Sequence, residues 1–215
     1  MNVLRLLLVL VLTYGTAANA AVIFSNGGMG TNSFVSDPDF PTVSADDFIL
    51  APGASTITGF QWTGLYAFSN TPQAADAFTI QIYADVAGAP DAGAPLHSLV
   101  IGNPGRIDTG VDSAGSDVYA YSANVVPIAL VPGTTFWLSI FNDTSADADD
   151  SWFWGMQDAV GNSFFRPASG DPWTQINNRH DFTLIGPLGV PEPHTLALLL
   201  IAAIAGVGYR RNHAN

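Results

Sequence analysis

The chain has 215 residues, no cysteine, and 18 acidic against 6 basic residues, which gives a net charge of −12 at pH 7. The lack of cysteine excludes a disulfide framework, thiol catalysis and thiolate metal sites. Within residues 21–189, seventeen aspartates stand against three arginines and no lysine, a net charge of −14. Such a surface repels nucleic acid and anionic lipid headgroups, so no nucleic-acid partner is expected.

Residues 1–20 have the pattern of a secretory signal peptide. Arg5 supplies a positive start, residues 6–12 form a short apolar run, and Ala18-Asn19-Ala20 provides the small residues of a cleavage site. The alternative, a short N-terminal core helix, does not explain why Ala-x-Ala stands so soon after this run. We expect cleavage after Ala20 and export of the rest of the chain.

The segment that follows reads as an all-β domain. Short runs of strand-forming residues recur between turns rich in glycine and proline, and no long segment of residues 22–189 has helical periodicity. In the run that begins at Phe78, the residues Phe78, Ile80 and Ile82 share one face. Pro127 marks a bulge or an edge. The predicted strands are 43–50, 55–68, 78–83, 96–101, 118–130, 135–141, 151–156 and 181–185.

Eight to ten such strands in one compact domain predict a single antiparallel β-sandwich of jelly-roll kind over residues 21–185. Residues 186–189, Gly-Pro-Leu-Gly, are predicted to be a short linker.

The loop after the sixth predicted strand is strongly acidic. Asp143, Asp147, Asp149 and Asp150 place four carboxylates within eight residues. Together they could supply oxygens to Ca²⁺, which takes six to eight oxygen ligands. The spacing is not that of an EF-hand, because the turn has no glycine and no glutamate closes the loop. The alternative is a solvated loop in which aspartate serves as a turn residue.

Two tryptophans stand out in the next predicted strand. Trp152 and Trp154 point to the same face if residues 151–156 form a strand. With Trp62 or Trp173 they could form an aromatic platform that binds carbohydrate. The alternative is packing in the core of the sandwich, which is the more frequent position of tryptophan in such folds.

The sequence offers little for catalysis. Residues 21–189 contain two histidines, His97 and His180, and both are expected in turns or at the surface. His180 and Asp181 are neighbours in sequence, so a strand would send them to opposite faces and prevent a direct triad contact. No nucleophile elbow, zinc-binding helix or phosphate loop is present. The chain is therefore not expected to be an enzyme.

The C-terminal segment combines three features. Val190, Pro191, Glu192 and Pro193 precede an uncharged stretch at residues 195–209, and Arg210 and Arg211 follow it. The stretch predicts a transmembrane helix, although the fourteen residues from Leu196 to Tyr209 span only about 21 Å of a hydrocarbon core of about 30 Å. The positive-inside rule keeps the arginine pair in the cytoplasm and places residues 21–189 outside the inner membrane. The alternative is a plain membrane anchor.

Residues 190–211 together resemble the PEP-CTERM sorting signal of Gram-negative bacteria. The resemblance implies recognition by an exosortase, a membrane enzyme that cleaves near the motif and passes the protein to the cell surface or beyond it. Pro191, Glu192 and Pro193 would then be recognition residues of a substrate. His194 departs from the family, which usually has a small polar residue there. The family is associated with exopolysaccharide and biofilm.

These observations favour an exported structural or interaction protein of the cell envelope or extracellular matrix. A carbohydrate-binding module that uses the tryptophans is the first alternative, and a secreted hydrolase is the second.

Overall fold

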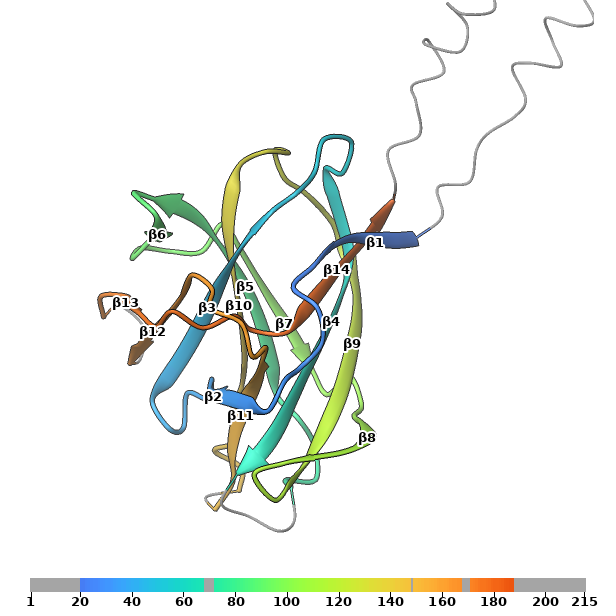
Figure 1. Ribbon diagram of the computed structural model, residues 1–215, viewed down its shortest axis with the longest axis vertical. Helices are drawn as coiled ribbons and strands as arrows, with labels where there is room; N and C mark the ends of the chain where they lie inside the picture. The colour runs from blue at the N-terminus through green and yellow to red at the C-terminus, as the bar shows by residue number, and fades with distance from the viewer. Residues whose placement is uncertain (1–19, 68–71, 148, 168–170, 188–215) are drawn as a thin grey trace, which may run out of the picture. The chain divides into compact units, whose positions relative to one another are not determined.

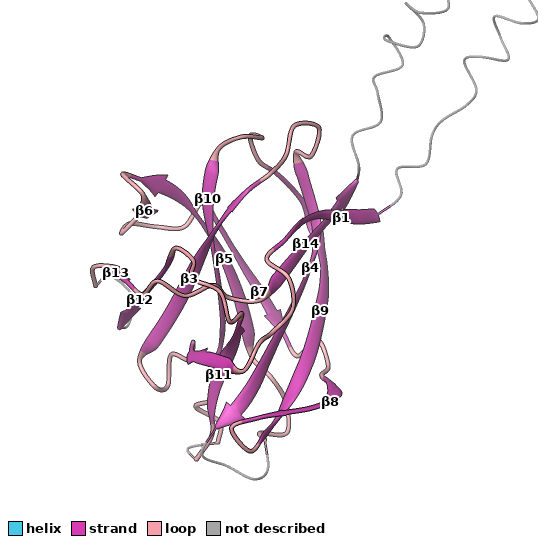
Figure 2. Ribbon diagram, in the orientation of Figure 1, coloured by secondary structure: helices cyan, strands magenta, loops and turns pink. Residues whose placement is uncertain are grey.

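The computed structural model describes residues 20–67, 72–147, 149–167 and 171–187. Residues 20–187 form one compact unit, shown in Figure 1. The predicted sorting signal and transmembrane helix, and the predicted signal peptide up to residue 19, lie outside the described residues. Figure 2 shows that the described residues are strands and loops. None of them forms a helix of the length and apolarity that crossing a membrane requires.

Fourteen strands make up the described part of the chain. They are β1 (Ala20–Ser25), β2 (Asn32–Val35), β3 (Thr42–Ile49), β4 (Thr56–Ala67), β5 (Phe78–Val86), β6 (Ala89–Pro90), β7 (His97–Gly102), β8 (Ile107–Ser113), β9 (Ser116–Ala129), β10 (Thr135–Asn142), β11 (Ser151–Met156), β12 (Ser163–Pro167), β13 (Thr174–Gln175) and β14 (Phe182–Pro187). They pair into two antiparallel sheets, as expected for a β-sandwich.

The first sheet is built around β4. One edge of β4 pairs with β9, and β9 also pairs with β8. The opposite edge of β4 is shared, because β14 pairs with its first half and β11 with its second half. β1 and β2 then extend this side of the sheet by pairing with β14 and β11.

The second sheet has the order β13-β12-β3-β10-β5, and both β6 and β7 pair with the remaining edge of β5. The alternation predicted for β5 is confirmed, since Phe78, Ile80 and Ile82 are all fully buried. Their face of the sheet contributes to the main core, which also contains Trp62 and Trp152 of the first sheet. This core needs no disulfide.

All eight predicted strands are present, with ends that shift by up to three residues. The register between β4 and β9 is irregular between Asn124 and Ile128, which agrees with the bulge expected at Pro127. The sequence patterns missed the short or strongly exposed strands β1, β2, β6, β8, β12 and β13. Such strands have too few alternating buried residues to produce a period of two.

The two ends of the described unit lie beside each other in the first sheet. Ala20 pairs with Pro187, and Ala21 pairs with Gly186. Gly186 and Pro187 were predicted to be linker, but they belong to β14. Gly186 has no room for a side chain, because a Cβ there would lie 2.0 Å from the backbone oxygen of Thr56.

Candidate functional site

The four carboxylates of the acidic loop have different surroundings. Asp150 is buried, and its Oδ2 accepts a hydrogen bond from the backbone N–H of Gln73. Asp143 and Asp149 are exposed. Asp147 shares a hydrogen bond with Asp149, which raises the pKa of Asp147. The Asp150 carboxylate is therefore buried and hydrogen-bonded, while the other three carboxylates are exposed or half-buried.

Calcium binding by this loop stays a prediction, and it gains no support from the residues that the structure describes. They include Asp143, Asp147, Asp149 and Asp150, and no group of three or more histidine or carboxylate side chains among them is placed to hold a metal ion. Four aspartates that are close together in sequence need not point their carboxylates toward one another. The Asp150 carboxylate satisfies a backbone donor of another loop instead of facing its neighbours.

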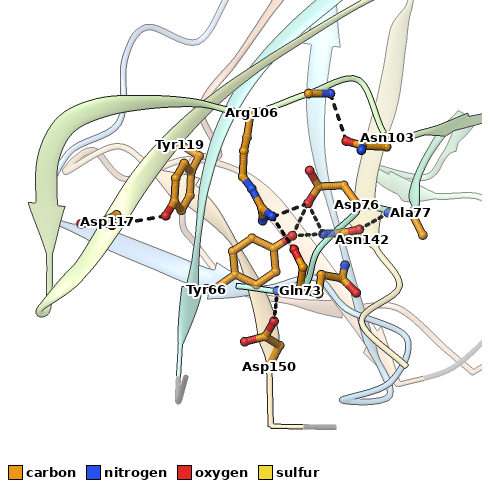
Figure 3. Close-up of polar contacts among 11 residues, drawn as sticks. Tyr66, Gln73, Asp76, Ala77, Asn103, Arg106, Asp117, Tyr119, Asn142 and Asp150 are labelled. Carbon is orange, nitrogen blue, oxygen red and sulfur yellow. Dashed lines mark hydrogen bonds and ion pairs between the residues drawn. The ribbon is translucent and has the colours of Figure 1, made fainter. Parts of the chain in front are cut away.

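Sequence reasoning missed a buried polar group around Arg106, shown in Figure 3. We call Tyr66, Asp76, Arg106 and Asn142 the Arg106 cluster. Arg106 Nη1 lies 3.7 Å from Asp76 Oδ1, and its guanidinium lies 5.2 Å from the centre of the Tyr66 ring. Asn142 Nδ2 donates to the Tyr66 hydroxyl at 2.7 Å and to Asp76 Oδ1 at 3.1 Å.

The Arg106 cluster connects the loop before β5 to the ends of β4 and β10 through hydrogen bonds. Asn142 Oδ1 accepts from the backbone of Ala77 at 2.7 Å, and the Arg106 guanidinium donates to the backbone oxygen of Gln73. Burial, with the hydrogen bond to Asp76, raises the pKa of Tyr66, so this phenol stays protonated and donates to the carboxylate. The feature of the sequence that could have indicated this cluster is the rarity of arginine, since residues 21–189 contain only three.

The tryptophan pair lies in the core. Trp152 and Trp154 are both fully buried, and Trp62 is nearly so. Gly64, across the strand pair from Trp154, allows the close approach of Trp152, whose ring would lie 2.4 Å from a Cβ at that position. The carbohydrate platform predicted on Trp152 and Trp154 is therefore wrong, and the core alternative is confirmed. Both side chains are on the same face of β11, and this face points into the core.

His180 is also a core residue, contrary to the prediction of a surface or turn position. Its ring stacks on Trp154, with the ring centres 4.4 Å apart and an angle of 11° between the planes. Its backbone N–H donates to buried Asp46. Burial lowers the pKa of His180 to about 3, so the imidazole is neutral at pH 7. His97, on β7, is half-buried.

A surface pocket of about 520 Å³ lies on the first sheet and contains a carboxyl group with an unusual pKa. Asp181 lines it together with hydroxyl and amide side chains that include Thr63, Gln61 and Ser122. Thr63 Oγ1 donates to Asp181 Oδ2 at 2.6 Å. Burial raises the pKa of Asp181 to about 6.

The pocket can hydrogen-bond a polar ligand and can exchange one proton near neutral pH. Among the described residues that line it, Asp181 and Tyr121 are the titratable ones, and burial raises the pKa of Tyr121 far above its ordinary value. An acid and base pair of the kind that glycosidases use needs two carboxyl groups on opposite sides of a bond. The lining residues supply one.

We expect Asp181→Asn to stabilise the protein at neutral pH. The pKa of Asp181 is above its unfolded value, so the stability that it contributes is complete below about pH 3.8 and is lost as the pH rises through about 6. A shift of this size corresponds to an energy on the order of 3 kcal/mol. Asparagine keeps an acceptor for Thr63 and does not ionise.

Urea unfolding at pH 3.5 and pH 7.5 measures this effect. The variant should gain stability over wild type at pH 7.5 and match it at pH 3.5, while the exposed control Asp171→Asn should follow wild type at both. Equal stability of Asp181→Asn and wild type at both pH values would contradict the assignment.

Comparisons with known proteins identify no family. No protein-family model matches the chain, and no curated protein matches it. Among solved structures, it is similar to the cysteine protease and lectin-like domains of Cwp84, a surface layer associated protein of Clostridium difficile, with 13% identity and a TM-score of 0.44. The match covers 67% of this chain and 32% of that one, so it spans about a third of that structure. A likeness this distant assigns no activity.

The described residues define the class of this protein through their own geometry. Over these residues the chain is all-β, with two antiparallel sheets and a core rich in aromatic side chains.

Proposed function

We propose that the chain is an exported structural or interaction protein of the cell envelope or extracellular matrix, delivered through its C-terminal signal by an exosortase. One observation carries the proposal. Val190-Pro191-Glu192-Pro193, an uncharged stretch at residues 195–209, and Arg210-Arg211 follow one another in a chain that begins with a signal-peptide pattern. Each part alone is weak, and the combination is specific.

In this proposal the precursor is anchored in the inner membrane by the helix at residues 195–209. Exosortase then recognises Pro191, Glu192 and Pro193 as substrate residues and releases or transfers the sandwich. The two prolines favour an extended backbone, which suits entry into an enzyme pocket. The destination is the cell surface or the extracellular space, where exopolysaccharide is a candidate partner.

The pairing of β1 with β14 supports processing at both ends. Cleavage after Ala20 removes one residue of β1, and Ala21 keeps its partner Gly186. Removal of residues beyond Pro187 leaves β14 complete. The core strands β5 and β10 belong to the other sheet and pair with neither β1 nor β14, so the sandwich can lose both signals and keep its packing.

The sandwich itself is proposed to act by binding or by assembly and not by catalysis. The stacking of His180 inside the core supports this, because it removes one of the two histidines of residues 21–189 from surface chemistry.

The repeated passage of the chain between the two sheets, from β3 to β4 to β5 and from β9 to β10 to β11, supports a jelly-roll arrangement.

We expect Glu192→Ala to block sorting in the native host. Glu192 is the single glutamate of the chain and stands between the two prolines, so its loss removes the one charge of the motif. The variant should accumulate in the inner-membrane fraction, while wild type reaches the surface or the medium. Immunoblots of separated cell fractions measure this distribution.

His194→Ala is the matched control, because it changes the next residue but one and leaves the Pro-Glu-Pro motif intact. It should distribute like wild type. If Glu192→Ala and wild type have the same distribution between the fractions, the sorting machinery does not recognise the motif.

A further inference from the structure

Arg166, on β12, is a buried cation with few partners. It is 5% exposed. Nη2 donates to the Tyr83 hydroxyl at 2.8 Å, and Nη1 lies 3.4 Å from the backbone oxygen of Ala92. Its guanidinium lies over two rings, 4.4 Å from the centre of Trp173 and 5.3 Å from that of Tyr83. Nε has no hydrogen-bond partner.

The missing partner is a carboxylate. All seventeen aspartates of the domain are among the described residues, and the one ion pair found there joins Arg106 to Asp76. Arg166 is thus a guanidinium that has lost most of its water without gaining an anion. A buried charge in this condition is costly, and the two aromatic rings offset only part of the cost.

Arg166 borders an open cavity of about 730 Å³ on the second sheet. Gln81 and Tyr83 of β5 and Phe141 of β10 line it beside the arginine, and the loop at residues 92–95 forms its rim. In Figure 1 the strands β6, β12 and β13, which flank this region, lie on the same side of the sandwich. Cavities of this size, with apolar walls and a few polar groups, are typical of small-ligand sites.

We propose that this cavity binds a single sugar that carries a carboxylate, a uronic acid, with Arg166 as the group that receives the carboxylate. A planar guanidinium with free N–H groups matches a carboxylate in shape and charge. Phe141 offers an apolar face to the ring carbons, and the Gln81 amide offers a donor and an acceptor to hydroxyl groups.

The surroundings favour a singly charged ligand. Arg166 is the one basic side chain among the described residues that line the cavity, and residues 21–189 contain no lysine. A phosphate carries close to two negative charges at pH 7 and would meet one cation inside a strongly acidic protein. A bare carboxylate such as acetate would leave most of the cavity and its aromatic wall unused. This site goes beyond the sorting proposal and does not depend on whether an exosortase recognises Glu192.

Isothermal titration of the full chain, purified in detergent, tests the site with glucuronate as the probe. Glucose, acetate and inorganic phosphate are the comparison ligands. Glucuronate should bind at least about tenfold more tightly than each of them, because glucose lacks the carboxylate that Arg166 would receive, and acetate and phosphate lack the sugar ring that would fill the cavity. Arg166→Met should abolish the binding, and Arg166→Lys should weaken it, because lysine keeps the charge and loses the planar fork.

Ala94→Trp provides a second variant that leaves Arg166 in place. Ala94 is an exposed residue of the cavity rim, so a large side chain there should block entry without disturbing the core. Ala51→Trp, at an exposed turn outside the cavity lining, is the matched control and should bind like wild type. A thermal melt of each variant confirms that it is folded.

Three results would overturn the proposal. The first is no heat with glucuronate at tens of millimolar. The second is unchanged binding in folded Arg166→Met or Ala94→Trp. The third is binding of glucose, acetate or phosphate as tight as that of glucuronate. Loss of glucuronate binding in both cavity variants, with retention in Ala51→Trp, supports it.

Discussion

Replacing Trp152 with alanine is expected to lower the free energy of unfolding by about 3–5 kcal/mol, the usual cost of removing a large buried aromatic. The indole is fully buried between the sheets. Its ring centre lies 5.0 Å from that of Phe78 and 6.3 Å from that of Tyr121, and both contacts are edge-on. The cavity left behind would have core side chains on each side and no water to fill it favourably.

Urea unfolding followed by circular dichroism measures this loss. Phe40→Ala is the control, because Phe40 is an aromatic residue that is 49% exposed, and its removal should cost much less. The outcome that contradicts the core position is a Trp152→Ala variant as stable as wild type that has lost carbohydrate binding. That result would restore the aromatic platform predicted from the sequence.

Acidification is expected to destabilise the wild-type protein through His180, and His180→Phe should remove this contribution. The folded pKa of His180, about 3, is below its ordinary value of 6.5, so the unfolded chain binds the proton first. Stability is therefore lost as the pH falls from about 6.5 toward 3. The shift corresponds to an energy on the order of 4–5 kcal/mol.

Phenylalanine keeps an aromatic ring against Trp154 and removes the two ring nitrogens, neither of which has a hydrogen-bond partner. The difference in unfolding free energy between His180→Phe and wild type, measured from pH 7.5 to pH 4, should grow as the pH falls. His97→Phe is the control for adding an aromatic ring at a half-buried histidine. A difference that does not change with pH would show that His180 is accessible to protons in the folded state.

His180 and Asp181 act in opposite directions although they are neighbours in the chain. Lowering the pH costs stability at His180 and restores it at Asp181. The pH dependence of the wild-type protein is the sum of these and other buried groups, so each effect is visible only as a difference between a variant and wild type.

Strand β5 was predictable because the side chains of its first half alternate strictly. The run from Phe78 to Ile82 buries every second residue, and this is the pattern that the sequence displays. β12 and β13 were not predictable in this way, since they have five and two residues. The Arg166 cavity lies beside these short strands, and this explains why the sequence alone gave no indication of it.

The surroundings of the candidate site residues were not predictable, for a different reason. The acidic loop and the Trp152–Trp154 pair were identified by residue type and spacing, and neither property fixes whether a side chain faces solvent. Asp150 points inward to a backbone donor, and both indoles point into the core. Conversely, the role proposed for Arg166 rests on the hydrogen-bond partner that its Nε lacks, and only the tertiary structure displays this.

The most direct measurement of the central claim is the intact mass of the protein recovered from its native host. We expect a polypeptide that begins at Ala21 and has lost the C-terminal stretch with Arg210 and Arg211. A molecule that retains both residues 1–20 and residues 194–215 would contradict export and sorting together.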